Sequence, residues 1–276
     1  MTDKPLDLIN RLRSELAAFA DSDFDTSLTG PARKKLATGI AEIHEQLDAL
    51  LREVDPIKQP AAVFDPAEPN VVGRFVALAM VAQPRAPLAA FDRFYGSGVY
   101  ALYYNGDFDA YAPIMGTETP IYVGKANPAE GSARTPMQQG DRLSGRLLDH
   151  RRSIEKSYNL DVADFECRAL VVQSGWQDAA EAYLIQLFEP VWNNETNILY
   201  GLGKHGDAAT TRANKRSPWD TLHPGRKWAL DDSLEDKRSA SQIESDLIAH
   251  FTATTQYQEL GAILDEFLTE LRQVAS

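Results

Sequence analysis

The sequence predicts an α+β fold, in which a short antiparallel sheet is flanked by helices and extended by helical segments at both ends. Residues 98–104 (GVYALYY) and 120–125 (PIYVGK) are short runs of β-branched and aromatic residues, which is the composition of strands. The polar interval between them is rich in turn formers. We therefore expect a hairpin with an enlarged loop, which places Tyr100 and Tyr122 on neighbouring strands.

Apolar residues at helical spacing predict most of the other elements. A pair of N-terminal helices is expected over residues 5–21 and from Pro31 to about Val54, and a proline-rich linker follows over residues 55–70. Further helices are expected over residues 71–83, 138–158 and 177–189, and a third strand over residues 165–172.

These elements suggest four parts. Residues 1–94 form an N-terminal helical extension, residues 95–195 the core, residues 196–230 a basic segment, and residues 231–276 an acidic helical segment. We expect the terminal helices to pack against one another, against the core or against a second subunit.

Composition excludes several classes of protein. The chain has 276 residues, of which 43% are hydrophobic and 25% charged, as in ordinary globular proteins. No apolar run approaches the roughly 20 residues of a membrane helix, and the N-terminus lacks the layout of a signal peptide. The single cysteine, Cys167, excludes an internal disulfide framework and a multi-cysteine metal site. We expect a cytoplasmic protein without a membrane partner.

Charge is unevenly distributed along the chain. The formal net charge of −12 argues against a general nucleic-acid binder, because such proteins neutralise phosphates with Lys and Arg. Residues 201–230, however, carry six basic and only two acidic side chains. This segment is therefore expected to form a local anion-facing surface on an acidic protein.

Two helices carry polar residues at informative spacings. Arg142, Arg146 and His150 recur every four residues and so line one side of their helix. Glu181 shares the apolar face of the helix over residues 177–189, where a carboxylate is costly unless it is paired or holds a metal. A partner arginine, or an edge position that reaches water, is the ordinary alternative.

Taken in order, these motifs resemble the GIY-YIG nucleases. The resemblance covers residues 95–194 and rests on Gly98-Val99-Tyr100, Tyr122-Val123-Gly124, Arg146 with His150, Glu181 and Asn193. Valine replaces the family's isoleucine in both motifs and keeps its β-branched character. The two motif tyrosines are 22 positions apart, farther than in compact members.

One branch of this superfamily is especially similar, the type II restriction endonucleases that cut CCGCGG. That branch also has Arg and His four residues apart, and an asparagine twelve residues after the glutamate, as Asn193 follows Glu181. The chain lacks the helicase, repair-partner and zinc-finger regions of other branches. The resemblance implies catalytic roles for Tyr100, Tyr122, Lys125, Arg146, His150, Glu181 and Asn193.

The roles follow from what phosphodiester hydrolysis needs. Glu181 would bind one Mg²⁺ ion per active site, and Arg146 would hold a phosphate oxygen. Tyr100 would contact or help deprotonate the attacking water, with Lys125 or His150 lowering its pKa or relaying the proton. Tyr122 would position the phosphate or the water. Asn193, slightly favoured over Asn194, would hold the metal shell or its loop.

The basic segment is the expected reader of the DNA sequence, because Arg and Lys read guanine and asparagine reads adenine. Its residues could instead contact only phosphates or cap the fold. Asn127, Arg134 and Gln138 or Gln139 are secondary candidates. The expected DNA-binding residues are Lys204, His205, Arg212, Lys215, Arg216, Arg226 and Lys227.

The resemblance thus predicts a Mg²⁺-dependent endonuclease that cuts double-stranded DNA at a short GC-rich palindrome such as CCGCGG. A homodimer would read such a site, and a cognate DNA methyltransferase would protect the host. Two alternatives remain open: a GIY-YIG nuclease of repair or mobile-element type, and a catalytically silent DNA-binding module.

Overall fold

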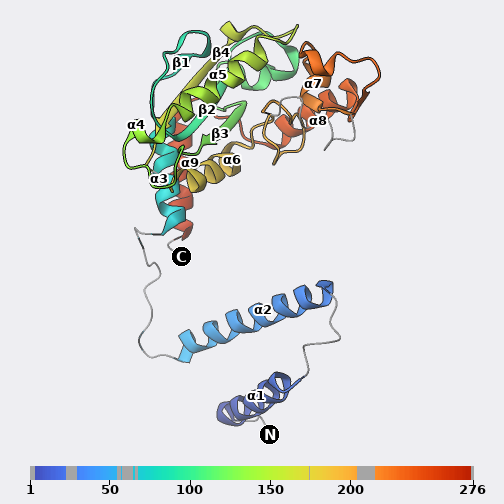
Figure 1. Cartoon of the computed structure of the whole chain (residues 1–276). Coiled ribbons are helices and arrows are strands. Elements are labelled where there is room, and N and C mark those ends of the chain that lie inside the picture. The colour runs from blue at the N-terminus through green and yellow to red at the C-terminus, as the bar shows by residue number, and fades with distance from the viewer. Residues whose placement is uncertain are drawn as a thin grey trace. The chain divides into compact units, whose positions relative to one another are not determined.

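The computed structural model describes residues 4–22, 30–54, 57, 65, 68–173, 175–203 and 215–274. The chain divides into two compact units, Met1–Ala61 and Ala62–Ser276. The first contains the two predicted N-terminal helices, α1 (Pro5–Ala20) and α2 (Gly30–Val54) (Figure 1). Proline in the first turn of each helix needs no hydrogen-bond donor there.

A four-stranded antiparallel sheet forms the centre of the second unit, with strand order β1-β4-β2-β3. The strands are β1 (Ala86–Pro87), β2 (Gly98–Tyr104), β3 (Tyr122–Ala126) and β4 (Phe165–Val171). Strands β2 and β3 are the expected hairpin, and β4 is the expected third strand. The mixed fold predicted from the sequence is therefore confirmed.

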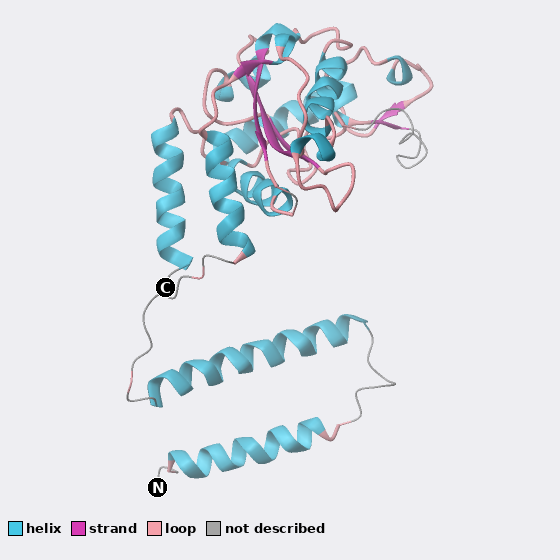
Figure 2. Cartoon of the chain, turned by 60° about the vertical axis from the view of Figure 1, so that its left-hand side comes forward, coloured by secondary structure: helices cyan, strands magenta, loops and turns pink. Residues whose placement is uncertain are grey.

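Every residue of β2 is buried, because helices cover both faces of the sheet (Figure 2). Alternate residues point to opposite faces. Val99, Ala101 and Tyr103 pack with α3 (Pro69–Val81), α6 (Gln177–Phe188) and α9 (Leu260–Val274). The intervening residues, including Tyr100, pack on the other face against α5 (Arg142–Ile154).

The long β2–β3 connection contains the 3₁₀ helix η2 (Asp109–Ile114) and packs beneath α8 (Ala240–Ala253). Helix α8 also contacts α7 (Pro218–Leu222). The short strands β5 (Lys215–Arg216) and β6 (Glu235–Asp236) pair in parallel nearby. Helix α4 (Pro136–Gln139) and the 3₁₀ helices η1 (Leu88–Ala90), η3 (Val162–Asp164) and η6 (Lys227–Ala229) complete the unit.

Two details differ from the four parts expected from the sequence. Helix α3, expected in the N-terminal extension, packs closely on α6 and belongs to the sheet-containing unit. The acidic C-terminal residues form two helices with separate partners, since α8 packs on α7 and η2 whereas α9 packs on α3. No helix in the described part of the chain is long and apolar enough to cross a membrane.

Candidate active site

Two glycines allow the strands to bring the tyrosines together. Gly98 has a φ of 156°, and a Cβ there would overlap the Leu170 carbonyl of β4. Gly124 lies directly opposite Tyr100 in the hairpin, and a Cβ on it would come within 2.6 Å of the Tyr100 hydroxyl. The glycine of each motif is thus required by close packing.

Tyr100 is paired with His150 in the interior. The Tyr100 Oη lies 2.7 Å from His150 Nε2, and both side chains are buried. Burial raises the pKa of the Tyr100 phenol well above its usual value. Burial therefore opposes a lowered pKa, the first of the two effects expected from Lys125 or His150, whereas Tyr100 and His150 lie close enough for the second, a proton relay.

Tyr122 lies between this buried pair and the protein surface. Its ring centroid is 4.7 Å from that of His150 and 6.0 Å from that of Tyr100. Burial raises the pKa of the Tyr122 phenol, and the nearby Arg146 acts in the opposite direction. Tyr122, unlike Tyr100 and His150, lines an open pocket.

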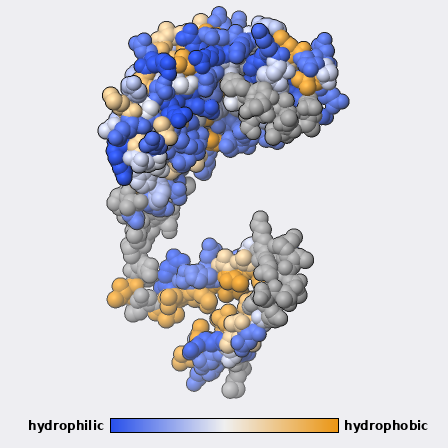
Figure 3. Space-filling model, in the orientation of Figure 1, coloured by the Kyte–Doolittle hydropathy of each residue, from blue (hydrophilic) through white to orange (hydrophobic). Residues whose placement is uncertain are grey.

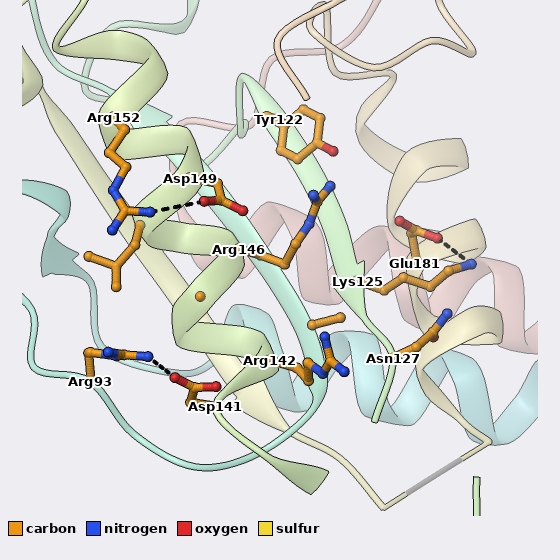
Figure 4. Close-up of a pocket in the computed structure, with 13 residues that line it drawn as sticks. Arg93, Tyr122, Lys125, Asn127, Asp141, Arg142, Arg146, Asp149, Arg152 and Glu181 are labelled. Atoms are coloured by element: carbon orange, nitrogen blue, oxygen red, sulfur yellow. Dashed lines mark hydrogen bonds and ion pairs between the residues drawn. The ribbon is translucent and has the colours of Figure 1, made fainter. Parts of the chain in front are cut away.

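This pocket has a cavity volume of about 590 Å³ and lies among α5, β3 and α6 (Figure 4). Tyr122 and Lys125 enter it from β3, Arg146 from α5 and Glu181 from α6. Four predicted site residues from three separate elements therefore meet in one cavity. The other charged or polar side chains that line it are Arg93, Asn127, Asp141, Arg142, Asp149 and Arg152.

Glu181 is paired with a lysine, and not with the arginine partner that the sequence analysis offered as an alternative. Its carboxylate lies 2.8 Å from Lys125 Nζ, which also lies 2.5 Å from Asp178, one turn earlier on α6. Burial alone would lower the pKa of Lys125, but the hydrogen bonds to the two carboxylates raise it. The Glu181 side chain is 20% exposed, so it faces the pocket from its wall and is not sealed in the core.

Arg146 supplies a fixed positive charge to the pocket. Burial alone would lower the pKa of its guanidinium, but the neighbouring Tyr100 and Tyr122 hydroxyls raise it. Two other arginines of the pocket are engaged with carboxylates, Arg93 with Asp141 and Arg152 with Asp149.

The donor set suits a cation held mainly by water and substrate. Among the described residues no group of three or more His, Cys, Asp or Glu side chains could surround a metal ion. Glu181 offers one carboxylate to the pocket, with Asp178 beside it. Mg²⁺ commonly binds proteins through one or two carboxylates and completes its shell with water and phosphate oxygens, so these residues fit it.

Asn193 clamps the strand that carries Tyr122. Its side-chain amide accepts a hydrogen bond from the Val123 amide and donates one to the Val123 carbonyl, both at 2.9 Å. Asn193 is buried, whereas Asn194 is exposed. Asn193 therefore holds the strand that carries Tyr122, and it does not line the pocket itself.

The basic segment is only partly described. Lys204, His205 and Arg212 lie outside the described residues. Lys215 pairs with Glu235 at 2.9 Å and Arg216 with Asp236 at 2.7 Å.

Arg226 corrects an expectation, because it cannot reach DNA in this structure. It is 2% exposed, pairs with Asp220, and donates to the carbonyls of Gly201 and Leu202. Arg226 therefore stabilises the fold from the interior. This agrees with the alternative expectation for the basic segment, that its residues support the fold and do not read DNA. Lys227, the next residue, is exposed.

The sequence did not point to some residues that lie near the pocket, and it pointed to others that have different roles. Asp178 lies three residues before Glu181 on the same helix, a spacing that could have identified it; nothing in the sequence around Arg93 marks it. Asn127 does line the pocket. Gln139 instead links Ser97, just before β2, to Val172, just after β4, and Gln138 caps α4.

Comparison with protein families gives a match over the nuclease region. The family model described as the Eco29kI GIY-YIG domain matches residues 92–251, more than half of the chain. The matched region contains the strands β2 to β6, the helices α5 and α6, and the whole pocket described above. A search of curated proteins gave no match.

Proposed function

The chain belongs to the family of Eco29kI GIY-YIG domains, and from this premise we propose that it is a Mg²⁺-dependent type II restriction endonuclease. It would hydrolyse double-stranded DNA at a short GC-rich palindrome. One observation carries the proposal: Tyr122, Lys125, Arg146 and Glu181 converge on a single open pocket although they come from three different elements.

The pocket is suited to a phosphodiester. Arg146 offers a planar fork of donors, which matches the oxygens of a phosphate, and its guanidinium is charged at any ordinary pH. Arg142 lies one turn earlier on the same helix and also lines the cavity. We assign Arg146 to the scissile phosphate and Arg142 to a neighbouring one.

Glu181 would hold the metal ion. A bound Mg²⁺ would supply charge stabilisation to the phosphate and to the departing 3′ oxygen. The Lys125 ammonium lies between the Glu181 and Asp178 carboxylates and pairs with both. Lys125 therefore neutralises the carboxylates and keeps Glu181 directed into the cavity.

The tyrosines and His150 would receive the proton of the attacking water. Since burial raises the pKa of both phenols, neither acts as a preformed phenolate. A neutral hydroxyl can accept a proton while it passes its own to a neighbour. We assign Tyr122 to accept the proton of the water in the pocket. The hydrogen-bonded Tyr100–His150 pair would then carry that proton further into the interior.

A palindromic site is read most simply by a two-fold dimer, in which each active site cuts one strand. The exposed Lys227 and the ion-paired Lys215 and Arg216 are the described residues of the basic segment that remain candidates for DNA contact. A restriction enzyme of this kind also requires a cognate methyltransferase that protects the host DNA.

The test is digestion of several plasmids of known sequence with Mg²⁺, with and without EDTA, followed by sequencing of the ends. We expect discrete fragments that share one GC-rich palindrome and no cutting in EDTA. A smear without sequence preference would favour a repair-type enzyme, and tight binding without cutting would favour a silent binding module; either result would refute the proposal.

Glu181→Ala tests the metal assignment. We expect cutting to be lost, whereas binding of the same DNA is largely retained. Glu259→Ala removes an exposed carboxylate just before α9 and serves as the matched control, which should cut normally. Cutting by Glu181→Ala at the normal rate would show that the metal is held elsewhere.

A further inference from the structure

Strand β3 and helix α6 are joined by two polar contacts beside the pocket. Lys125 pairs with Glu181, and two residues farther along the chain Asn127 accepts a hydrogen bond of 3.3 Å from Gln177. Alternate residues of an extended segment share a face, as do residues four apart on a helix. The two contacts are therefore neighbours, and Asn127 lies on the same wall of the pocket as Lys125 and Glu181 (Figure 4).

The hydrogen bonds of Gln177 fix the direction of its side-chain amide. Its oxygen accepts from the backbone N–H of Gly175 at 2.9 Å, and a backbone N–H can only donate. The amide nitrogen of Gln177 is then the atom that faces Asn127, and it too can only donate. The side chain of Gln177 is buried, with 4% of its surface exposed, so the surrounding core holds it in place. Gln177 is therefore a fixed donor toward Asn127.

This order of donors and acceptors also fixes the amide of Asn127. Its oxygen faces Gln177, so its nitrogen is directed away from Gln177. No group in the described part of the chain accepts a hydrogen bond from this nitrogen. Because Asn127 is exposed and lines the pocket, it offers the pocket a donor whose direction is set by a buried residue.

The surroundings of this donor favour an anion. The residues that line the pocket include five basic and three acidic side chains. Arg142 and Arg146 lie across the pocket from Asn127, on α5 (Figure 4). Figure 3 shows mostly hydrophilic side chains over the face of this unit that carries α5. A negatively charged oxygen in the pocket would therefore meet arginines on one side and the Asn127 donor on the other.

We propose that Asn127 donates a hydrogen bond to a phosphate oxygen of the DNA strand in the pocket, and that Gln177 is the positioning residue that holds the Asn127 amide for this contact. The inference deepens the proposed function and rests on it, since it takes DNA as the ligand. A base fits less well than a phosphate. Asparagine reads adenine with its oxygen and nitrogen together, and the oxygen of Asn127 is already turned to Gln177, whereas a phosphate needs only the donor.

Binding of DNA in EDTA, which removes the metal ion needed for cutting, tests the contact of Asn127. The probes are two short duplexes of equal composition. One contains the palindrome recovered from the plasmid digests, or CCGCGG if no palindrome is recovered, and the other contains neither. We expect Asn127→Ala to weaken binding to both duplexes about tenfold, the usual order for a hydrogen bond to a charged group.

The sign of the effect is tested with a charge. Asn127→Asp should bind both duplexes more weakly than Asn127→Ala, because its carboxylate repels a phosphate. Asn70→Asp adds the same charge at an exposed position of α3 and is the matched control, which should bind normally. Stronger binding by Asn127→Asp than by Asn127→Ala would contradict a contact with phosphate.

Two further outcomes would overturn the proposal. One is normal binding by Asn127→Ala. The other is a loss confined to the palindromic duplex, because a phosphate contact supports binding to every sequence, whereas a base contact supports only its own site. A natural chain that binds both duplexes but cuts neither in Mg²⁺ would refute the proposed endonuclease and leave this test valid. Binding to neither duplex would refute both.

A double-mutant cycle tests the positioning role of Gln177. Gln177→Met nearly keeps the size of the side chain and removes its hydrogen bonds, so the Asn127 amide is free to turn. We expect Gln177→Met to weaken binding less than Asn127→Ala does, and the double variant to bind no more weakly than Asn127→Ala alone. Fully additive losses would show that Gln177 supports binding only through the fold, which would overturn its positioning role. Near-ultraviolet circular dichroism checks that each variant is folded, and the variants of exposed Asn127 test the contact independently of Gln177.

Discussion

Replacement of Gly124 by alanine tests how closely the two tyrosines are packed. A Cβ at this position would lie 2.6 Å from the Tyr100 hydroxyl oxygen, 2.7 Å from its Cζ and 2.9 Å from Cε1 of Tyr122. All three separations are well inside ordinary van der Waals contact. The Tyr100 ring is fully buried, and its hydroxyl is hydrogen-bonded to His150. The ring therefore has no free space into which it can move.

We expect Gly124→Ala to cost about 1–3 kcal/mol of unfolding free energy, the usual cost of one added carbon in a tightly packed interior. We also expect cleavage to slow at least tenfold, because displacement of Tyr100 disturbs the 2.7 Å contact with His150. DNA binding should change much less, because Arg146 projects from a different element.

Urea unfolding and single-turnover cleavage at saturating enzyme measure the two effects. Gly261→Ala is the matched control: it lies in helix α9, and a Cβ there would meet nothing within 4 Å. This control should be unchanged or more stable by up to about 1 kcal/mol, because alanine favours helix over glycine. If Gly124→Ala unfolds and cuts like the natural protein, the steric argument fails.

Two further predictions concern buried polar residues. Asn193→Ala removes both hydrogen bonds to Val123 and should cost about 1–3 kcal/mol in urea unfolding, whereas exposed Asn194→Ala should cost little; equal effects would contradict the strand clamp. Burial lowers the pKa of His223 to about 3, against about 6.5 in an unfolded chain. Between these values only the unfolded state binds the proton, so this residue's contribution to stability is complete above pH 6.5 and is lost as the pH falls. The expected slope is at most about 1.4 kcal/mol per pH unit, measured by urea unfolding from pH 7 to 5. His223→Gln should have a shallower slope, and an unchanged slope would show that other groups are responsible.

Local patterns in the sequence determined the elements and the family. Strand composition predicted β2, β3 and β4, and helical spacing predicted α1, α2, α3, α5 and α6 to within a few residues. These features can be recognised from the sequence alone because they depend on residues that are close together along the chain. The order of the motifs then identified the GIY-YIG family, which the family comparison confirms.

Tertiary structure decided how the individual side chains are used. Spacing could show that Glu181 shares an apolar face, but only the fold shows that Lys125, from a strand, holds it. Asn193 and Arg226 have polar side chains that the sequence alone could assign to metal or DNA. Both are buried and hydrogen-bonded to backbone groups, and Arg226 also pairs with Asp220.

The physical reason for this division is the range of the interactions. Hydrophobic periodicity and turn chemistry act within about ten residues, so a single sequence displays them directly. The partner of a buried polar group is chosen by chain segments that meet only after folding, as Tyr100 and His150 do from fifty positions apart. The sequence by itself therefore determined which elements form and which residues could do chemistry, and the packing of the sheet between its helices decided which of them meet.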